Sequence, residues 1–103
     1  MKRRRARLLR NGASARRTMA TMKAAFVLVR CEMGKIEEVA NSIMEIEGVS
    51  EVHSITGPWD LLVKLYAPDY DAFGDLIPGG LQKVPGIRDT ETMLAFRAFN
   101  PAG

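Results

Sequence analysis

A chain of 103 residues is the size of one small domain. Its composition, 47% hydrophobic and 26% charged, is typical of a globular protein, and its longest apolar run of six residues (24–29) excludes a membrane-spanning helix, which needs about 18–20. Cys31 is the one cysteine in the sequence, which excludes an internal disulfide and a multi-cysteine zinc site and fits a reducing, cytoplasmic environment.

The formal net charge of +3 is unevenly distributed along the chain. Residues 1–22 contain eight basic side chains and no acidic one, which leaves residues 23–103 with a net charge of −5. We interpret residues 1–22 as a basic tail that is disordered or an artefact of start-site assignment, with a nucleic-acid-binding arm and a transit peptide as open alternatives. Because the rest of the chain is acidic, we do not expect it to bind DNA directly.

The chain then alternates strand and helix patterns. Residues 24–31 form a compact apolar run that predicts a strand. Apolar residues at helical spacing follow, and Gly48 ends the helix that they predict. The apolar face of this helix consists of Ile36, Val39, Ala40, Ile43, Met44 and Ile46. β-branched alternation over 49–56 and an apolar run over 59–66 predict two more strands, which a short turn at 57–58 joins into a hairpin.

A second helix is predicted to begin at 68–69 and to end at 85–86. The Pro-Gly-Gly sequence at 78–80 interrupts it, which predicts a kink or two short pieces. Its apolar face consists of Tyr70, Phe73, Ile77, Leu81 and Val84. The fourth strand is expected within 87–99.

An internal repeat relates the two halves of this pattern. Residues 46–55 match residues 84–93 at an offset of 38 residues. Two βαβ units with right-handed crossovers predict an α+β fold, a ferredoxin-like βαββαβ sandwich with a four-stranded antiparallel sheet and two helices on one face. We expect the folded domain over residues 23–99, with 100–103 as a flexible C-terminus.

Two of the predicted strands carry apolar residues on both faces. On the first strand, Phe26 and Leu28 point opposite to Ala25, Val27 and Val29. On the third strand, Leu62 and Tyr66 point opposite to Trp59, Leu61, Val63 and Leu65. A sheet that helices cover on one face only should alternate apolar and polar residues. We therefore expect a second subunit to cover the helix-free face, in a homodimer or a larger oligomer.

The sequence offers little material for catalysis, and we predict no catalytic residue, no metal site and no cofactor. His53 is the one histidine, and no Ser-His-Asp or Cys-His arrangement can be completed around it. Cys31, inside an apolar strand, is most simply a small core residue. The glycines at 79–80 lack the flanking Lys and Ser/Thr of a phosphate-binding loop.

Asp60 stands out because it opens an apolar strand beside a Gly-Pro turn, where a carboxylate needs a partner. In one reading it hydrogen-bonds backbone amides of its own turn. In the other it binds the ammonium group of a ligand, while turn amides at Gly57 accept a carboxylate. The residues alone leave both readings open.

Three segments occur together in this order: 46–49 at the end of the first helix, 52–57 followed by Asp60, and 84–87 followed by Thr90 and Thr92. In this combination the chain resembles the Lrp/AsnC ligand-binding domain, the regulation-of-amino-acid-metabolism (RAM) domain of transcription regulators, over about residues 24–97. The resemblance implies a sandwich of the dimeric α+β barrel type that dimerises through its sheets and often builds octamers or decamers. It also implies that small effectors, typically amino acids, bind between dimers.

Carried over by position, the resemblance assigns Gly57, Pro58 and Asp60 to the hairpin that cradles the effector. It assigns Thr90 and Thr92 to the same pocket. Two departures stand out: the full-length regulators have an N-terminal helix-turn-helix domain, which 22 residues cannot hold, and the break at 78–80 is unusual in the second helix. The chain therefore looks like a stand-alone form of the sensor domain.

Three readings of function follow. The first is a non-enzymatic sensor of a small molecule, expected to be an amino acid, that assembles with itself or with full-length Lrp/AsnC regulators and modulates transcription. The second is a small enzyme of the dimeric α+β barrel type, which would need His53 in a deep pocket. The third is a nucleic-acid binder that uses residues 1–22, with binding that depends steeply on salt.

Overall fold

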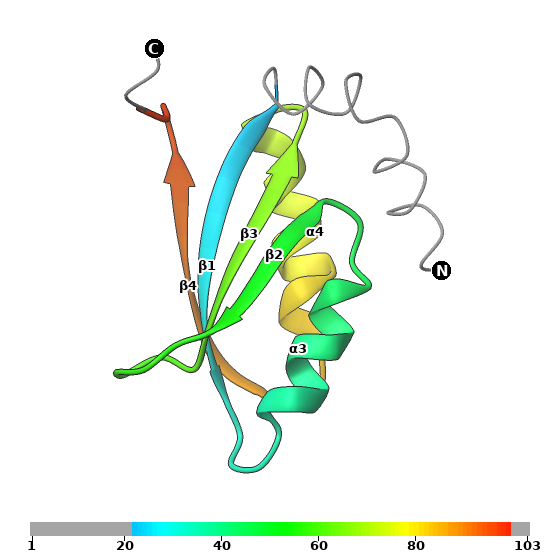
Figure 1. Cartoon of the computed structure of the whole chain (residues 1–103). Coiled ribbons are helices and arrows are strands. Elements are labelled where there is room, and N and C mark those ends of the chain that lie inside the picture. Colours follow the sequence, from blue (N-terminus) through cyan, green and yellow to red (C-terminus); the bar gives the residue numbers. More distant parts are fainter. Residues whose placement is uncertain (1–21, 100–103) are drawn as a thin grey trace, which may run out of the picture.

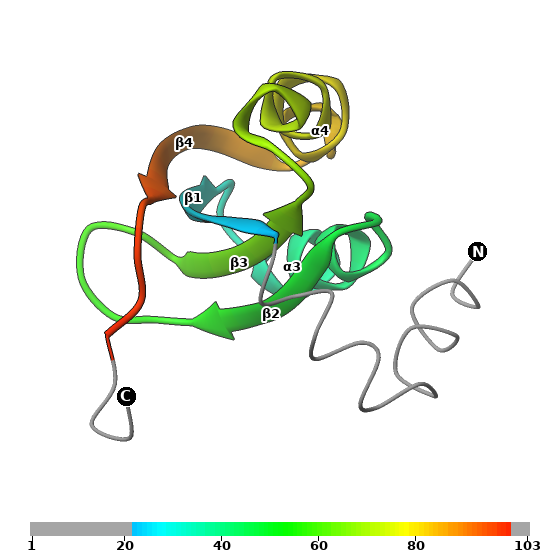
Figure 2. The ribbon, with the colours of Figure 1, turned by 90° about the horizontal axis from the view of Figure 1, so that it is seen from above.

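The computed structural model describes residues 22–99, and the predictions made for the chain before and after this range lie outside the described residues. A four-stranded sheet carries the helices on one face (Figures 1 and 2). The elements in chain order are β1 (Lys23–Cys31), α3 (Ile36–Met44), β2 (Val49–Ser54), β3 (Leu61–Ala67), the 3-10 turn η1 (Tyr70–Ala72), α4 (Phe73–Gly79), the 3-10 turn η2 (Leu81–Lys83) and β4 (Ile87–Ala95). In this range no helix combines the length and the apolar character that crossing a membrane requires.

The strands pair in the order β2-β3-β1-β4, and every neighbouring pair is antiparallel. β1 is central: Val27, for example, lies opposite Val63 of β3 on one side and Thr92 of β4 on the other. Each helical segment connects two strands that are not neighbours in the sheet, as a βαβ crossover requires. The predicted α+β, ferredoxin-like βαββαβ sandwich is therefore confirmed.

The core lies between the sheet and the helices. One face of β3 is buried along its whole length and one face of β1 from Ala25 to Cys31, since alternate residues of a strand point to the same side. The buried strand residues are Ala25, Val27, Val29, Cys31, Leu61, Val63, Leu65 and Ala67, together with Val49 of β2. The helical segments contribute Val39, Ile43, Phe73, Ile77 and Leu81. These residues lie on the predicted apolar faces, and Cys31 is a core residue as expected.

Two predicted boundaries are wrong. α3 ends at Met44, before Ile46, the last position of the predicted helical face, because the Glu45 and Ile46 amides donate to carbonyls three residues back and tighten the last turn. The hairpin connection is longer than a tight turn and spans residues 55–60. The predicted break in the second helix is confirmed, since α4 ends at Gly79 and η2 follows as a separate turn.

Gly48 and Gly86 show that the internal repeat is structural. Each precedes an equivalent strand, β2 or β4, and each has a φ of +96°, a left-handed value that other residues rarely adopt. A Cβ at Gly48 would lie 2.8 Å from the carbonyl oxygen of Tyr66, and one at Gly86 would lie 2.9 Å from Cγ2 of Val39. Both positions therefore require glycine for its conformation and for its lack of a side chain.

The helix-free face of the sheet, called the open face below, carries one of the two apolar sets predicted for β1 and β3, and the core takes the other. The cross-strand register aligns Leu28 of β1 with Leu62 of β3, and Phe26 with Met93 of β4. Tyr66 lies beside this group, level with Ala24 of β1. These apolar side chains form the apolar centre of the open face. Two charged residues lie among them: Lys64, whose Nζ lies 5.8 Å from the centre of the Phe26 ring and 5.4 Å from that of Tyr66, and Glu91, which is level with Leu28.

Candidate functional site

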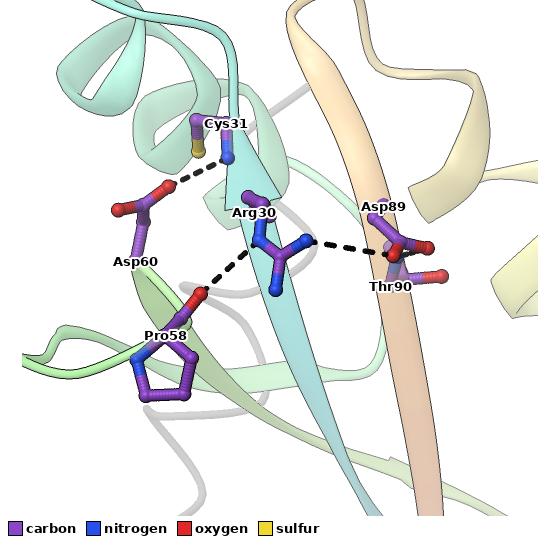
Figure 3. Close-up of polar contacts among 6 residues, drawn as sticks. All are labelled: Arg30, Cys31, Pro58, Asp60, Asp89 and Thr90. Carbon is purple, nitrogen blue, oxygen red and sulfur yellow. Dashed lines mark hydrogen bonds and ion pairs between the residues drawn. The ribbon is translucent and has the colours of Figure 1, made fainter.

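The candidate site lies at the end of the sheet where β1 ends and where β3 and β4 begin. The 55–60 connection joins β2 to β3 here and projects from the sheet on the side away from the helices (Figures 1 and 2). Figure 3 shows the polar contacts between this connection, the last residues of β1 and the first part of β4. Three segments that are distant in the sequence therefore meet at one rim.

Asp60 attaches the 55–60 connection to β1. Its Oδ2 accepts a hydrogen bond from the backbone N of Cys31 at 2.8 Å (Figure 3), and its own backbone N donates to the carbonyl of Val29 at 2.9 Å. The carbonyl of Asp60 accepts from the amide of Ile55 at 2.9 Å, which closes the base of the hairpin. The hydrogen bond from Cys31 agrees with the structural reading of Asp60. The amide that donates it, however, belongs to β1 and not to the turn that contains Asp60.

Arg30, the last residue but one of β1, is a residue that the sequence reasoning did not single out. Its Nε donates to the carbonyl of Pro58 at 3.1 Å, and its guanidinium carbon lies 4.7 Å from the centre of the Trp59 ring. On the other side, its Nη1 is 3.9 Å from Oδ2 of Asp89 in β4 (Figure 3). The sequence feature that could have pointed to Arg30 is its charge, since it is the one charged residue in the otherwise apolar run 24–31.

Trp59 differs from its prediction. The sequence placed it in the third strand, on the same face as Leu61 and Val63, but β3 begins at Leu61 and Trp59 lies before it. The ring is half-buried and packs against the Arg30 guanidinium. The reason is tertiary, because a cation at the end of β1 offers the indole face a partner outside the core.

Gly57 and Pro58 are exposed at the outer part of the connection. Gly57 has a φ of +106°, and a Cβ there would have no heavy atom within 4 Å. Glycine is therefore favoured here by backbone conformation alone. Pro58 contributes its carbonyl to Arg30, so its role in the described contacts is through the backbone.

Thr90 and Thr92 lie on β4, across β1 from Asp60. Thr90 is opposite Val29, level with the beginning of β3, and its hydroxyl accepts a hydrogen bond from Nε2 of Gln82 at 2.8 Å. Thr92 is opposite Val27, farther from the rim, and is exposed. The structure therefore brings Thr90 to the same end of the sheet as Asp60 and places Thr92 farther along β4.

The thiol of Cys31 lies next to this rim, on the core side. Burial raises its pKa above the ordinary value, and the negative charge of Asp60 raises it further. A raised pKa suppresses the thiolate, which is the nucleophilic form of cysteine. The thiol is therefore suited to packing and poorly suited to covalent chemistry.

His53, on which the enzymatic reading depends, lies on the edge strand β2 with its side chain 57% exposed. Its Nε2 is 2.9 Å from Oε1 of Glu51, and this hydrogen bond lowers the pKa of Glu51. The deep pocket that the enzymatic reading requires is inconsistent with such exposure. Within residues 22–99, no three His, Cys, Asp or Glu side chains are grouped so that they could hold a metal ion.

Comparison with protein families gives a match between residues 24–102 and the Lrp/AsnC ligand-binding domain. The chain belongs to this family. An uncharacterized HTH-type transcriptional regulator of Pyrococcus furiosus is 37% identical over 75 residues, which are 70% of this chain and 50% of that protein. The leucine-responsive regulatory protein of Escherichia coli is 32% identical over 56 residues, 54% of this chain and 34% of that protein. The chain thus spans about half the length, or less, of these curated relatives.

Solved structures of the family share the fold. A protein from Thermus thermophilus superposes with a TM-score of 0.72 at 37% identity, covering 77% of this chain and 99% of that chain. A transcriptional regulator of Neisseria meningitidis, solved in complex with L-Met, gives a TM-score of 0.70 at 19% identity over 95% of this chain and 70% of that chain. At 19% identity, the similarity to the Neisseria meningitidis protein shows a shared fold only. The resemblance drawn from the sequence is therefore confirmed at the level of family and architecture.

Proposed function

We propose that this chain is a non-enzymatic sensor domain that binds an amino-acid effector at the rim described above and acts through assembly. Asp60 binds the ammonium group of the effector. The carboxylate and the remaining polar groups of the effector are bound by Gly57, in the hairpin that includes Pro58, and by Thr90 or Thr92 on β4. The partners are a second copy of the chain, in a dimer or in larger octamers or decamers, and full-length regulators of the Lrp/AsnC family.

The observation that carries this proposal is the fixed, half-buried carboxylate of Asp60 at the mouth of an exposed connection. A carboxylate can accept several hydrogen bonds, so the bond from Cys31 to Oδ2 leaves acceptor capacity for an ammonium group. A partly desolvated carboxylate attracts a cation more strongly than one in open water. The complex of the Neisseria meningitidis regulator with L-Met supports an amino acid as the class of effector.

Assembly is supported by the apolar centre of the open face. Phe26, Leu28, Leu62 and Tyr66 are only half-buried in the single chain, and Met93 is 41% exposed. Covering them with a second copy would remove apolar area from water, which stabilises association. Thr92 and Leu94, on the other face of β4, are also exposed, so a neighbouring subunit could complete the site there.

A thermal-shift screen of the full chain tests the proposal, with each common amino acid added separately and L-methionine first. An effector present at 100 times its Kd should stabilise the folded chain by about 2.7 kcal/mol. Light scattering on the same samples should show at least a dimer. A protein whose melting temperature responds to no amino acid would refute the sensor role, and a stable folded monomer would refute assembly.

A further inference from the structure

The 55–60 connection is held at two separate levels. Its base is attached through Asp60, which bonds to Ile55, Val29 and Cys31. Its outer part has a different support, because the Pro58 carbonyl and the Trp59 ring both contact Arg30. The base therefore depends on the pairing of β1 with β3, whereas the outer part depends on one side chain.

We propose that Arg30 is the positioning residue of the site: through its contacts with Pro58 and Trp59 it holds the outer part of the 55–60 connection in one conformation. The arginine side chain suits this task, since its planar fork can donate along one edge while its face stacks on an aromatic ring. Here Nε donates to Pro58 and Nη1 approaches Asp89 (Figure 3). The guanidinium carbon also lies over the Trp59 ring. Lysine has neither the planar face nor the fork.

The link to β4 continues beyond the ion pair. Asp89 approaches Arg30 through Oδ2, and its Oδ1 accepts a hydrogen bond from the backbone N of Thr90 at 2.9 Å. Because Arg30 lies on β1, between β3 and β4, it is placed between the 55–60 connection, which carries Asp60, and the strand that carries Thr90 and Thr92. Its side chain is 39% exposed and that of Asp89 is 59% exposed, so the ion pair itself is weak. Arg30 therefore holds the connection mainly through its hydrogen bond to Pro58 and its contact with Trp59.

Trp59 is the one tryptophan in the chain, so its fluorescence reports directly on this connection. In the full chain without effector, Arg30→Gln should shift the emission of Trp59 to longer wavelength and raise its acrylamide quenching constant, since the indole face loses its cationic cover. Arg30→Lys keeps the charge but loses the planar group, so we expect an intermediate change. Asp89→Asn is the matched control, because it weakens the ion pair and leaves the contacts with Pro58 and Trp59; its emission should equal that of the wild type.

Wild-type emission and quenching in Arg30→Gln would overturn the proposal. If Arg30→Gln does not melt cooperatively, the same fluorescence measurements are made on Arg30→Lys. Emission and quenching equal to those of the wild type in Arg30→Lys would then overturn the proposal. The role in binding rests on the proposed function and has its own measurement: Arg30→Gln should lose most of any stabilisation that L-methionine, or another amino acid from the screen, gives the wild type. A wild type that responds to no amino acid would remove the effector and leave the fluorescence test of Arg30 intact.

Discussion

Two substitutions of Asp60 separate its bond to β1 from its proposed charge interaction. Asp60→Asn keeps an oxygen acceptor for the Cys31 amide but removes the negative charge. Truncating one partner of a desolvated charge pair commonly costs about 2–5 kcal/mol, so the Kd for the effector should rise roughly 30-fold or more. The unliganded protein should lose only about 1 kcal/mol, since a charge-assisted hydrogen bond becomes a neutral one.

Asp60→Ala removes the acceptor as well, at a bond of 2.8 Å to a part-buried amide. An unsatisfied buried donor costs about 1–3 kcal/mol, and in a domain of this size each kcal/mol lowers the melting temperature by about 4–8 °C. Calorimetric titration with the responding amino acid, beside a melting curve of each unliganded variant, measures both effects. Wild-type affinity in Asp60→Asn would refute the ammonium role, and a wild-type melting temperature in Asp60→Ala would refute the attachment of the connection to β1.

Three further predictions concern other parts of the molecule. Gly57→Ala should cost about 1–2 kcal/mol for its left-handed backbone alone. Gly48→Ala should destabilise the fold by more, because its new Cβ would also lie 2.8 Å from a backbone oxygen, whereas the Cβ at position 57 has no heavy atom within 4 Å. Equal losses in chemical denaturation would contradict this. Because the pKa of the folded Cys31 thiol is raised, the free energy of unfolding should fall as the pH rises above about 8.5, where the unfolded chain releases a proton that the folded chain retains. Denaturation curves of Cys31→Ala should lack this contribution, and an unchanged slope would contradict it. Leu62→Glu, on the open face, should yield folded monomers by light scattering, whereas an unchanged oligomer would exclude this face as the interface.

Several properties of this protein were determined by local patterns in its sequence. Alternation along 24–31 and 59–66 predicted which side chains share a face of each strand, because every second residue of a strand points to the same side. The structure buries one predicted set on each strand, apart from Trp59. The repeat predicted two equivalent βαβ halves, and Gly48 and Gly86 occupy equivalent left-handed positions in them. Apolar residues on the second face of β1 and β3 were also predicted, whereas the place of Met93 beside Phe26 was decided by the pairing of β1 with β4.

The candidate site was predicted only in part, because its contacts cross the sheet. Asp60 and Pro58 could be found from their place beside a turn, but their partners, Cys31 and Arg30, lie 29 and 28 residues away in the sequence. These partners become neighbours only when β1 pairs with β3, and Asp89 joins them only when β4 pairs with β1. The sequence therefore determined which residues belong to strands and core, whereas the pairing of the strands decided which polar groups meet at the rim, since hydrogen bonds and ion pairs depend on distance in space and not along the chain.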